Sequence, residues 1–222
     1  MTDIAANLAD IRRRIADAAA AADRKPADVT LVAVSKTVEV PGLEAALAEG
    51  QRIFGENRVQ EAEAKWPGLR ARHTGLQLRL IGPLQTNKAK DAVRLFDVIE
   101  TIDRPKLIEA LAKASDQVGR RPRVLVQVNI GREPQKAGVD PDQADALIDA
   151  ARLAGFVVDG VMCIPPAEGD PSPHFDRLGE IGRRNGLAQL SMGMSGDFEL
   201  AIRHGSTHVR VGSAIFGARG GP

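Results

Sequence analysis

Lys36 is the residue whose type and position in this sequence best suit chemistry. It lies near the end of a short run, residues 29–37, that is mostly apolar and β-branched and therefore predicts a buried strand. Side chains alternate along a strand, so Lys36 shares a face with Val32 and Val34, while the opposite face is also apolar. Such a strand is typical of a parallel sheet covered by helices, in which ligands bind at the carboxyl ends of the strands. A solvated lysine in a loop is the alternative.

Two later segments are rich in glycine and serine and could bind an anion. The first holds Ser195 between Gly193 and Gly196, and the second is Gly212 followed by Ser213. Glycines let backbone N–H groups approach an oxyanion, and serine hydroxyls donate hydrogen bonds to it. Ordinary turns would also explain either segment alone. In a barrel of alternating strands and helices, phosphate often binds after the seventh and eighth strands, which is where these segments fall.

A lysine amine beside a phosphate site indicates a phosphorylated aldehyde or ketone as the ligand. Partial desolvation favours the neutral amine, which is the form that attacks a carbonyl carbon. Pyridoxal 5′-phosphate fits this description, and so does a sugar phosphate in a Schiff-base aldolase. An aldolase also needs a proton-transfer group near the lysine, and Glu56 and Asp103, the carboxylates at predicted strand ends, are not clearly placed for that role.

Strand and helix patterns alternate along the chain without a linker or a low-complexity segment. About eight repeats in 222 residues predict an α/β fold, a single (β/α)8 TIM-type barrel domain over residues 1–222, with an open doubly wound sheet as the alternative. Apolar residues at helical spacing predict an additional N-terminal helix over residues 4–15. We expect it to occupy the outer place after the last strand, where no long helix is predicted. The helix after the second strand is expected to end near Lys65, at the breaker 66–68. The predicted strands are residues 29–37, 52–54, 76–81, 98–101, 124–130, 156–164, 187–191 and 207–211.

Composition argues against several other classes of protein. The formal net charge is +1 and basic residues are balanced by acidic ones, so no nucleic-acid partner is expected. No apolar run approaches the roughly 20 residues that span a bilayer, and no membrane partner is expected. Cys163 is the only cysteine, which excludes an intrachain disulfide and favours the reducing cytoplasm. His204 and His208 are the two histidines with a ligand-like spacing, but a glycine lies between them and a strand is predicted to begin near the second, so no zinc site is expected. No exposed apolar stripe indicates an obligate dimer, so we expect a monomer.

Seven sequence motifs, in order along nearly the whole chain, resemble those of the pyridoxal phosphate homeostasis protein family. This family resemblance implies a single barrel similar to the N-terminal domain of alanine racemase. It also implies pyridoxal phosphate held as a Schiff base on Lys36. The motifs are residues 33–37 (Ala-Val-Ser-Lys-Thr), 54–57 (Phe-Gly-Glu-Asn) with 59–61, 81–88 (Ile-Gly-Pro-Leu-Gln-Thr-Asn-Lys), 136–138 (Lys-Ala-Gly), 160–162 (Gly-Val-Met) with Pro165, 190–195 (Leu-Ser-Met-Gly-Met-Ser) and 209–213 (Val-Arg-Val-Gly-Ser) with 215–217.

The resemblance also implies which residues contact the cofactor. Asn57 is expected at the pyridine ring, and Ser195, Gly212 and Ser213 at the phosphate. Arg210 is expected to contact either the ring nitrogen or the phosphate, and the sequence does not decide between them. An arginine at the ring nitrogen would keep it unprotonated and weaken the electron sink that most such enzymes use. The full predicted set is Lys36, Asn57, Met194, Ser195, Arg210, Gly212 and Ser213.

The sequence departs from the family pattern at two positions. Arg58 stands where a tyrosine is usual, and Arg79 stands where a histidine is usual. Neither change touches the lysine or the phosphate segments. We therefore expect both arginines to alter the rim of the pocket and not its capacity to bind the cofactor.

The resemblance leaves two classes of function. The first is a carrier that holds pyridoxal phosphate and related B6 vitamers and releases them or delivers them to apo-enzymes. The second is a pyridoxal phosphate enzyme such as an amino-acid racemase, which pairs the lysine with a tyrosine on the other side of the cofactor. The chain contains no tyrosine, and Cys163, a possible substitute, falls inside a predicted strand. We therefore expect a carrier and not an enzyme.

Overall fold

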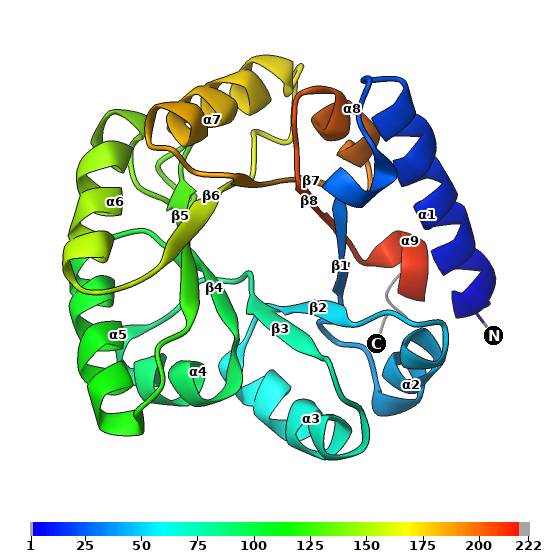
Figure 1. The fold of residues 1–222 in the computed structure, drawn as a ribbon, viewed down its shortest axis with the longest axis horizontal. Helices are drawn as coiled ribbons and strands as arrows, with labels where there is room; N and C mark the ends of the chain where they lie inside the picture. Colours follow the sequence, from blue (N-terminus) through cyan, green and yellow to red (C-terminus); the bar gives the residue numbers. More distant parts are fainter. Residues whose placement is uncertain (1, 218–222) are drawn as a thin grey trace.

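The computed structural model describes residues 2–217 and shows a closed barrel of eight parallel strands, which neighbour one another in chain order (Figure 1). The barrel closes where β1 pairs with β8, Thr30 lying opposite His208. The predicted (β/α)8 fold is confirmed. The strands are β1 (Thr30–Val34), β2 (Ile53–Glu56), β3 (Gln77–Leu80), β4 (Val98–Ile102), β5 (Arg123–Val128), β6 (Val158–Cys163), β7 (Gln189–Met194) and β8 (His208–Val211).

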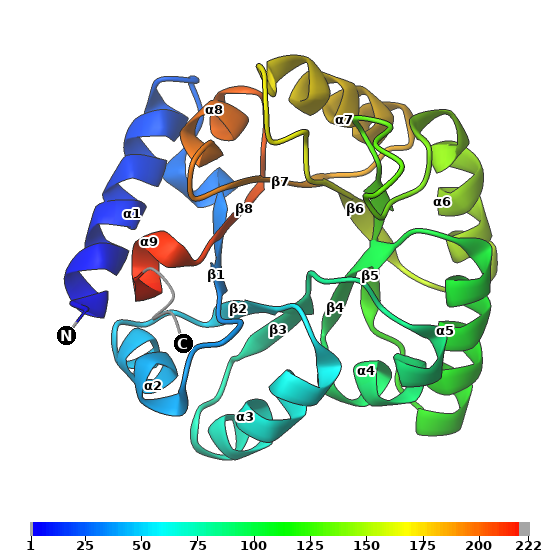
Figure 2. The same cartoon turned by 180° about the vertical axis from the view of Figure 1, so that it is seen from behind.

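Helices cover the outside of the barrel on every side, as seen from both faces in Figures 1 and 2. They bury their apolar faces against the outward side chains of the strands, for example Leu107 and Leu111 of α5. The α-helices are α1 (Ile4–Ala20), α2 (Val40–Ala48), α3 (Val59–Arg72), α4 (Ala89–Leu95), α5 (Pro105–Val118), α6 (Ala144–Leu153), α7 (Ser172–Arg184), α8 (Phe198–Arg203) and α9 (Ser213–Phe216), with 3-10 turns η1 (Pro26–Asp28), η2 (Thr86–Lys88) and η3 (Pro141–Gln143).

The N-terminal helix α1 takes the outer place that follows β8. Its backbone N-terminus is capped by Asp3, whose carboxylate accepts from the Ala6 N–H at 2.9 Å. Leu8, Ile11 and Ile15 are buried at helical spacing. The helix packs against α8, α9 and α2 (Figure 1), because α9 is too short to cover this side of the barrel. The expectation for this helix is confirmed.

The helix α3 does not end where the sequence predicts. It runs through Pro67 to Arg72, although proline removes one backbone donor from a helix. Trp66 and Leu69 lie on either side of Pro67 and are fully buried, and the Trp66 ring packs against Phe54 of β2 at 4.9 Å between centroids. This burial keeps the chain helical past the proline.

The interior of the barrel carries charge where such barrels usually carry branched apolar side chains. Val98, Leu125 and Met162 form a small apolar cluster on the side of β4, β5 and β6. Arg79 and Glu100 are buried beside them and ion-paired. In the described part of the chain, no helix is both long enough and apolar enough to cross a membrane.

Candidate functional site

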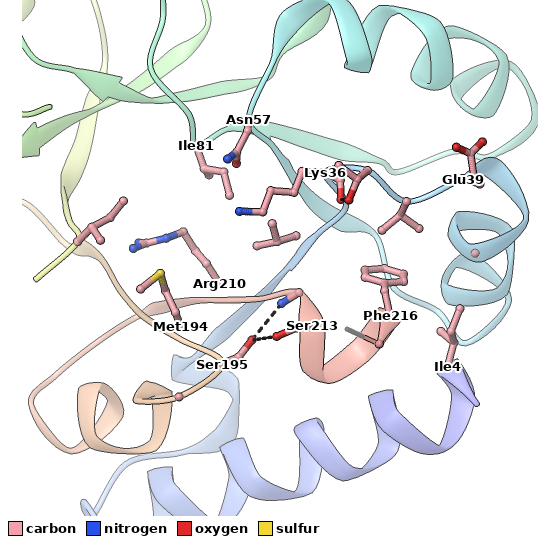
Figure 3. Close-up of a pocket in the computed structure, with 18 residues that line it drawn as sticks. Ile4, Lys36, Glu39, Asn57, Ile81, Met194, Ser195, Arg210, Ser213 and Phe216 are labelled. Atoms are coloured by element: carbon pink, nitrogen blue, oxygen red, sulfur yellow. Dashed lines mark hydrogen bonds between the residues drawn. The ribbon is translucent and has the colours of Figure 1, made fainter. Parts of the chain in front are cut away.

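A cavity of about 610 Å³ opens at the carboxyl ends of β1, β2, β7 and β8 (Figure 3). All seven residues predicted from the sequence line it, although they come from positions up to 177 residues apart. The lining residues are Ile4, Val34, Lys36, Thr37, Val38, Glu39, Gly42, Asn57, Ile81, Ile164, Met194, Ser195, Gly196, Arg210, Gly212, Ser213, Phe216 and Gly217.

Lys36 enters the cavity from the loop that follows β1. Its side chain is half-buried and extends into the cavity towards Arg210 (Figure 3). Val32 and Val34, which share its face of the strand, are buried. The Ser35 N–H donates to the Gly55 carbonyl of β2 at 2.9 Å, so the inter-strand bonding continues to the residue before the lysine. The predicted inward direction of Lys36 is therefore confirmed.

Asn57 lies beside Lys36, directly after β2 (Figure 3). The loop after β3 passes against its backbone at Gly82, where an added Cβ would lie 2.2 Å from the Asn57 carbonyl oxygen. Only glycine allows this approach. The motif that begins at Ile81 thus fixes the position of Asn57 and supplies the apolar side chain of Ile81 to the cavity wall.

Ser195, Gly212 and Ser213 come together on the opposite wall of the cavity (Figure 3). The Ser195 Oγ accepts from the Gly212 N–H at 3.4 Å and lies 3.4 Å from the Ser213 Oγ. These contacts are long for hydrogen bonds that involve a hydroxyl. The two hydroxyls and the N–H are therefore only weakly engaged with one another, and they could turn to an anion placed between them.

The two glycines that flank Ser195 in the sequence behave differently. Gly196 lines the cavity, whereas Gly193 does not. Gly193 lies within β7 with a φ of +92°, and an added Cβ would lie 2.6 Å from the Ala201 Cβ of α8. The sequence places Gly193 in an anion-binding loop, but in the structure it allows close packing of β7 against α8.

Arg210 closes the cavity from the barrel side and is 4% exposed. Its guanidinium donates to the Ser191 Oγ and to the Cys163 carbonyl, both at 2.8 Å. Ser191 in turn donates to Glu100 at 2.5 Å, because arginine offers no acceptor for the serine proton. Arg210 is thereby fixed on the side of Lys36 and away from Ser195 (Figure 3).

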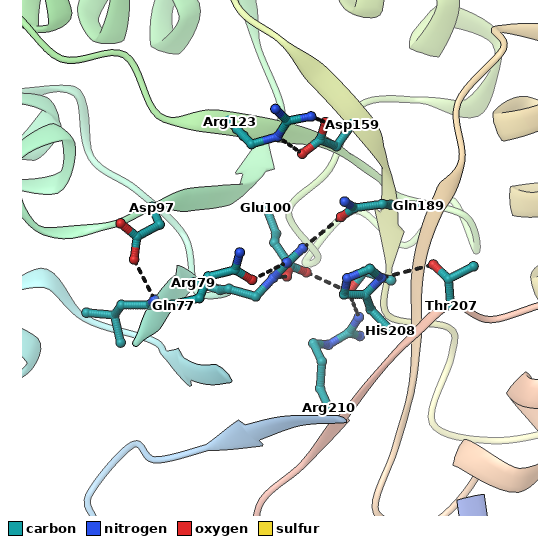
Figure 4. A network of polar contacts seen from close by, with 12 residues as sticks. Gln77, Arg79, Asp97, Glu100, Arg123, Asp159, Gln189, Thr207, His208 and Arg210 are labelled. Carbon is teal, nitrogen blue, oxygen red and sulfur yellow. Dashed lines mark hydrogen bonds and ion pairs between the residues drawn. The ribbon is translucent and has the colours of Figure 1, made fainter. Parts of the chain in front are cut away.

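Glu100 joins Arg210 to a second buried arginine, Arg79, as Figure 4 shows. Burial acts against the charge of Glu100, but Arg79, Arg210 and Ser191 together hold the pKa of its carboxyl below the usual value. Arg79 also donates to Gln77 at 3.0 Å and to Gln189 at 3.1 Å. The floor of the cavity is therefore a connected polar network.

The expectation for Arg79 was wrong. It is 1% exposed, points into the barrel from β3 and does not line the cavity, so it lies beneath the site and not at its rim. Arg58 is exposed before α3 and does not line the cavity either. Arg58 directly follows the motif 54–57 and Arg79 comes shortly before the motif 81–88, so both lie near cavity residues in the sequence. The alternation of side chains along β3, however, turns Arg79 towards the barrel axis.

Other candidate groups lie outside the cavity. Glu56 is fully buried and accepts hydrogen bonds from Ser35 at 2.7 Å and Trp66 at 2.9 Å. Burial raises the pKa of Asp103 despite its ion pair with Arg104. Neither carboxylate faces Lys36 across the cavity, as an aldolase would require.

Cys163 is likewise unsuited to catalysis. It is fully buried in β6, and burial raises the pKa of its thiol to about 12. This fits the expectation of a core residue. Among residues 2–217, no cluster of three histidine, cysteine or acidic side chains could hold a metal ion.

The residues that sequence reasoning missed are mainly the apolar walls of the cavity. Val34 and Ile164 face it from β1 and from the end of β6, while Ile4 and Phe216 line its far end. The positions of Val34 and Ile164 at the ends of predicted strands could have indicated that these two residues face the cavity. Ile4 and Phe216 gave no signal, because the packing of α1 against α9 brings them to the site.

Comparison with known proteins places the chain in a family. The model of the family described as alanine racemase, N-terminal domain, matches residues 6–220. The pyridoxal phosphate homeostasis protein of Escherichia coli (strain K12) is 40% identical, with 99% of this chain and 98% of that protein covered. The protein of the same name from Pseudomonas aeruginosa is 41% identical, with 99% and 97% covered.

Solved structures agree with this result. PipY of Synechococcus elongatus PCC7942, determined with PLP bound, is 36% identical with a TM-score of 0.82, and the alignment covers 97% of this chain and all of PipY. Alanine racemase of Clostridium difficile 630 has a TM-score of 0.71 at 14% identity, with 96% of this chain and 58% of the racemase covered, which shows a shared fold alone. The chain therefore belongs to the pyridoxal phosphate homeostasis protein family, which shares its barrel with the N-terminal domain of alanine racemase.

Proposed function

We propose that this protein binds pyridoxal 5′-phosphate as a Schiff base on Lys36 and serves in its intracellular homeostasis by holding and releasing it. One observation carries the proposal: an amine, a fixed guanidinium and a set of hydroxyl and N–H donors converge on one cavity. The names of the relatives and the PLP-bound structure of PipY support it.

The donor set fits the parts of this cofactor. The phosphate would accept hydrogen bonds from Ser195, Ser213 and the Gly212 N–H, and Asn57 would lie at the ring. The Lys36 amine would reach the aldehyde. Met194, which is 39% exposed, would cover the entrance. The amine and the weakly engaged hydroxyls lie on opposite walls of the cavity, so the ring would lie between them (Figure 3).

We assign Arg210 to the ring nitrogen and not to the phosphate. Its two hydrogen bonds, to Ser191 and to the Cys163 carbonyl, hold the guanidinium towards the barrel floor. A guanidinium can only donate, so it would keep the ring nitrogen unprotonated. This would weaken the cofactor as an electron sink and supports storage over catalysis.

The aldehyde of the cofactor would supply the covalent chemistry. The Lys36 nitrogen would form a C=N bond to the aldehyde carbon, and the aldehyde oxygen would leave as water with the two protons of the neutral amine. Lys36 must be present as the neutral amine for this step. An incoming amine would release Lys36 by forming its own C=N bond to the same carbon. The phosphate contacts of Ser195 and Ser213 would then be left to hold the ligand. Related vitamers that share the ring would bind through the same contacts. Apo-enzymes are the proposed recipients.

A racemase is the second candidate, because the barrel resembles that of alanine racemase. Racemisation needs a proton donor on the face of the substrate opposite the lysine. The chain has no tyrosine, and Glu39, the carboxylate that lines the cavity, lies beside α2 on the far side from the Lys36 amine (Figure 3). We therefore favour a carrier that acts as a monomer. The buried single cysteine suits the reducing cytoplasm.

The first experiment is an absorption spectrum of the protein loaded with pyridoxal phosphate, before and after borohydride. We expect a visible band that borohydride removes, and peptide mapping that places the reduced cofactor on Lys36. Lys36→Ala should lose the band, while weak binding through the phosphate contacts remains. An adduct on Lys88 or Lys136 would contradict the assignment.

The second experiment separates the two classes of function. The loaded protein should transfer its cofactor to an apo-transaminase and should not exchange the α-hydrogen of alanine in deuterated water. Exchange with inversion at about one per second, a rate within the usual range for enzymes, would show a racemase. If the cofactor reaches the apo-transaminase no faster than it dissociates into buffer, the protein stores the cofactor and does not deliver it.

A further inference from the structure

The loop that carries Lys36 has a strained backbone. Thr37 has a φ of +61°, in the left-handed region. A β-branched residue is an outlier there, because its branched Cβ crowds the backbone. Thr37 is exposed, so burial of its own side chain does not impose the conformation. Within the loop, the Val38 N–H donates to the Ser35 carbonyl at 3.1 Å and the Thr37 hydroxyl donates to the Lys36 carbonyl at 2.6 Å. Contacts from outside the loop add to these bonds.

Helix α3 supplies these contacts through Glu61 and Lys65. The Glu61 carboxylate accepts a hydrogen bond from the Thr37 N–H, the amide of the strained residue itself. The Lys65 ammonium donates to the Ser35 carbonyl at 2.9 Å and to the Val38 carbonyl at 3.4 Å. The two side chains are one helical turn apart and bond to each other at 3.1 Å. Together they contact the backbone on both sides of Lys36.

The two side chains are themselves held in place from within the protein. Lys65 is 10% exposed and lies 2.9 Å from Glu56, which is fully buried at the end of β2. Glu56 also accepts from the Ser35 hydroxyl and the Trp66 indole. Burial opposes the charge of Glu61, but the Thr37 N–H and Lys65 outweigh it and lower the pKa of its carboxyl. Glu61 is therefore a charged acceptor at neutral pH.

We propose that Glu61 and Lys65 are positioning residues that clamp the loop 35–38 in its strained form and thereby aim the Lys36 amine into the cavity. Neither residue lines the cavity. The inference rests on the proposed function, since it concerns how Lys36 meets an aldehyde. It gives α3 a role in positioning Lys36, although neither Glu61 nor Lys65 would contact the cofactor.

The clamp has a thermodynamic consequence that distinguishes it from a general structural role. Without it, Thr37 relaxes to a negative φ and Lys36 is correctly aimed in only a fraction of molecules. The apparent affinity then falls by that fraction, but only for ligands that need the amine. A ligand held by the phosphate contacts alone is unaffected.

The test compares Glu61→Met, which removes the acceptor, with Glu61→Gln, which retains one. Glu63→Met is the matched control, because Glu63 is exposed on the same helix. Each variant is titrated with pyridoxal 5′-phosphate and with pyridoxine 5′-phosphate, whose alcohol cannot bond covalently to lysine. For Glu61→Met we expect roughly tenfold weaker binding of the aldehyde, the value for one hydrogen bond to a partly exposed charged group, and unchanged binding of the alcohol. Glu61→Gln should recover most of the loss.

Two further measurements address the strained residue directly. In the cofactor-free protein, the Thr37 amide should exchange its hydrogen faster in Glu61→Met than in Glu63→Met. Adding Thr37→Asn to Glu61→Met should restore part of the affinity for the aldehyde, because asparagine tolerates a positive φ better than threonine.

The possible failures can be told apart. If the unmodified protein forms no borohydride-reducible bond to Lys36, the proposed function fails. If it does form the bond, and Glu61→Met binds the aldehyde as tightly as Glu63→Met, or weakens both ligands equally, the clamp is refuted and the proposed function stands.

Discussion

The sharpest prediction concerns the two serines that face Lys36 across the cavity. Replacing Ser195 or Ser213 by alanine removes one donor to the proposed phosphate and no apolar contact. A hydrogen bond to a charged group contributes about 1.5–3 kcal/mol, which corresponds to roughly 10- to 150-fold in affinity. The backbone N–H of Gly212 remains in both variants.

The structure ranks the two substitutions. Ser195 is half-buried and contacts both Gly212 and Ser213, so its hydrogen bond would be less screened by water. We expect Ser195→Ala to weaken binding by about 2 kcal/mol, or roughly 30-fold. Ser213 is exposed, so Ser213→Ala should weaken binding by about tenfold, the low end of this range. Because the hydroxyls contact each other, the double variant should lose less than the sum.

The assay is an absorbance titration of each variant with pyridoxal 5′-phosphate and, separately, with pyridoxal. Pyridoxal has the aldehyde and lacks the phosphate, so its affinity should stay within about twofold of the unmodified protein. Ser172→Ala, at the start of α7 and outside the cavity, controls for a serine lost elsewhere. An equal loss of affinity for both ligands would mean that the serines shape the loops and do not bind phosphate.

Two other predictions concern stability. Burial, and to a smaller extent the charge of Arg79, lowers the pKa of His208 from 6.5 to about 4. Between these two pH values the unfolded chain binds a proton that the folded protein does not. The free energy of unfolding should therefore fall by up to about 3 kcal/mol as the pH drops from 6.5 to 4. Urea denaturation should show a flatter profile for His208→Gln, and identical profiles would contradict the buried neutral state. Gly193→Ala should destabilise the protein by about 3 kcal/mol through its positive φ and its contact with Ala201, whereas Gly196→Ala, with open space around it, should cost little. Thermal unfolding of the two variants checks this, and equal melting temperatures would refute it.

The sequence alone determined the barrel and the direction of Lys36. Strand periodicity is local, so the apolar alternation around Val32 and Val34 is sufficient to place Lys36 on the inward face. Short αβ connections and parallel strands then leave few topologies, and the carboxyl ends of the strands define where a site can form. The local pattern also indicated Ser195, Gly212 and Ser213 as an anion site, whereas Asn57, Met194 and Arg210 followed from the family resemblance alone.

Only the tertiary structure decided what surrounds those residues. The burial of Trp66 against Phe54 of β2 carried α3 past Pro67 and holds this helix against the barrel, which places Glu61 and Lys65 beside the Lys36 loop. Arg79 lies in the barrel floor because Glu100, from the next strand, neutralises its charge there. These outcomes depend on contacts between segments that are distant in the sequence, whose energies exceed local preferences, and no local pattern encodes them.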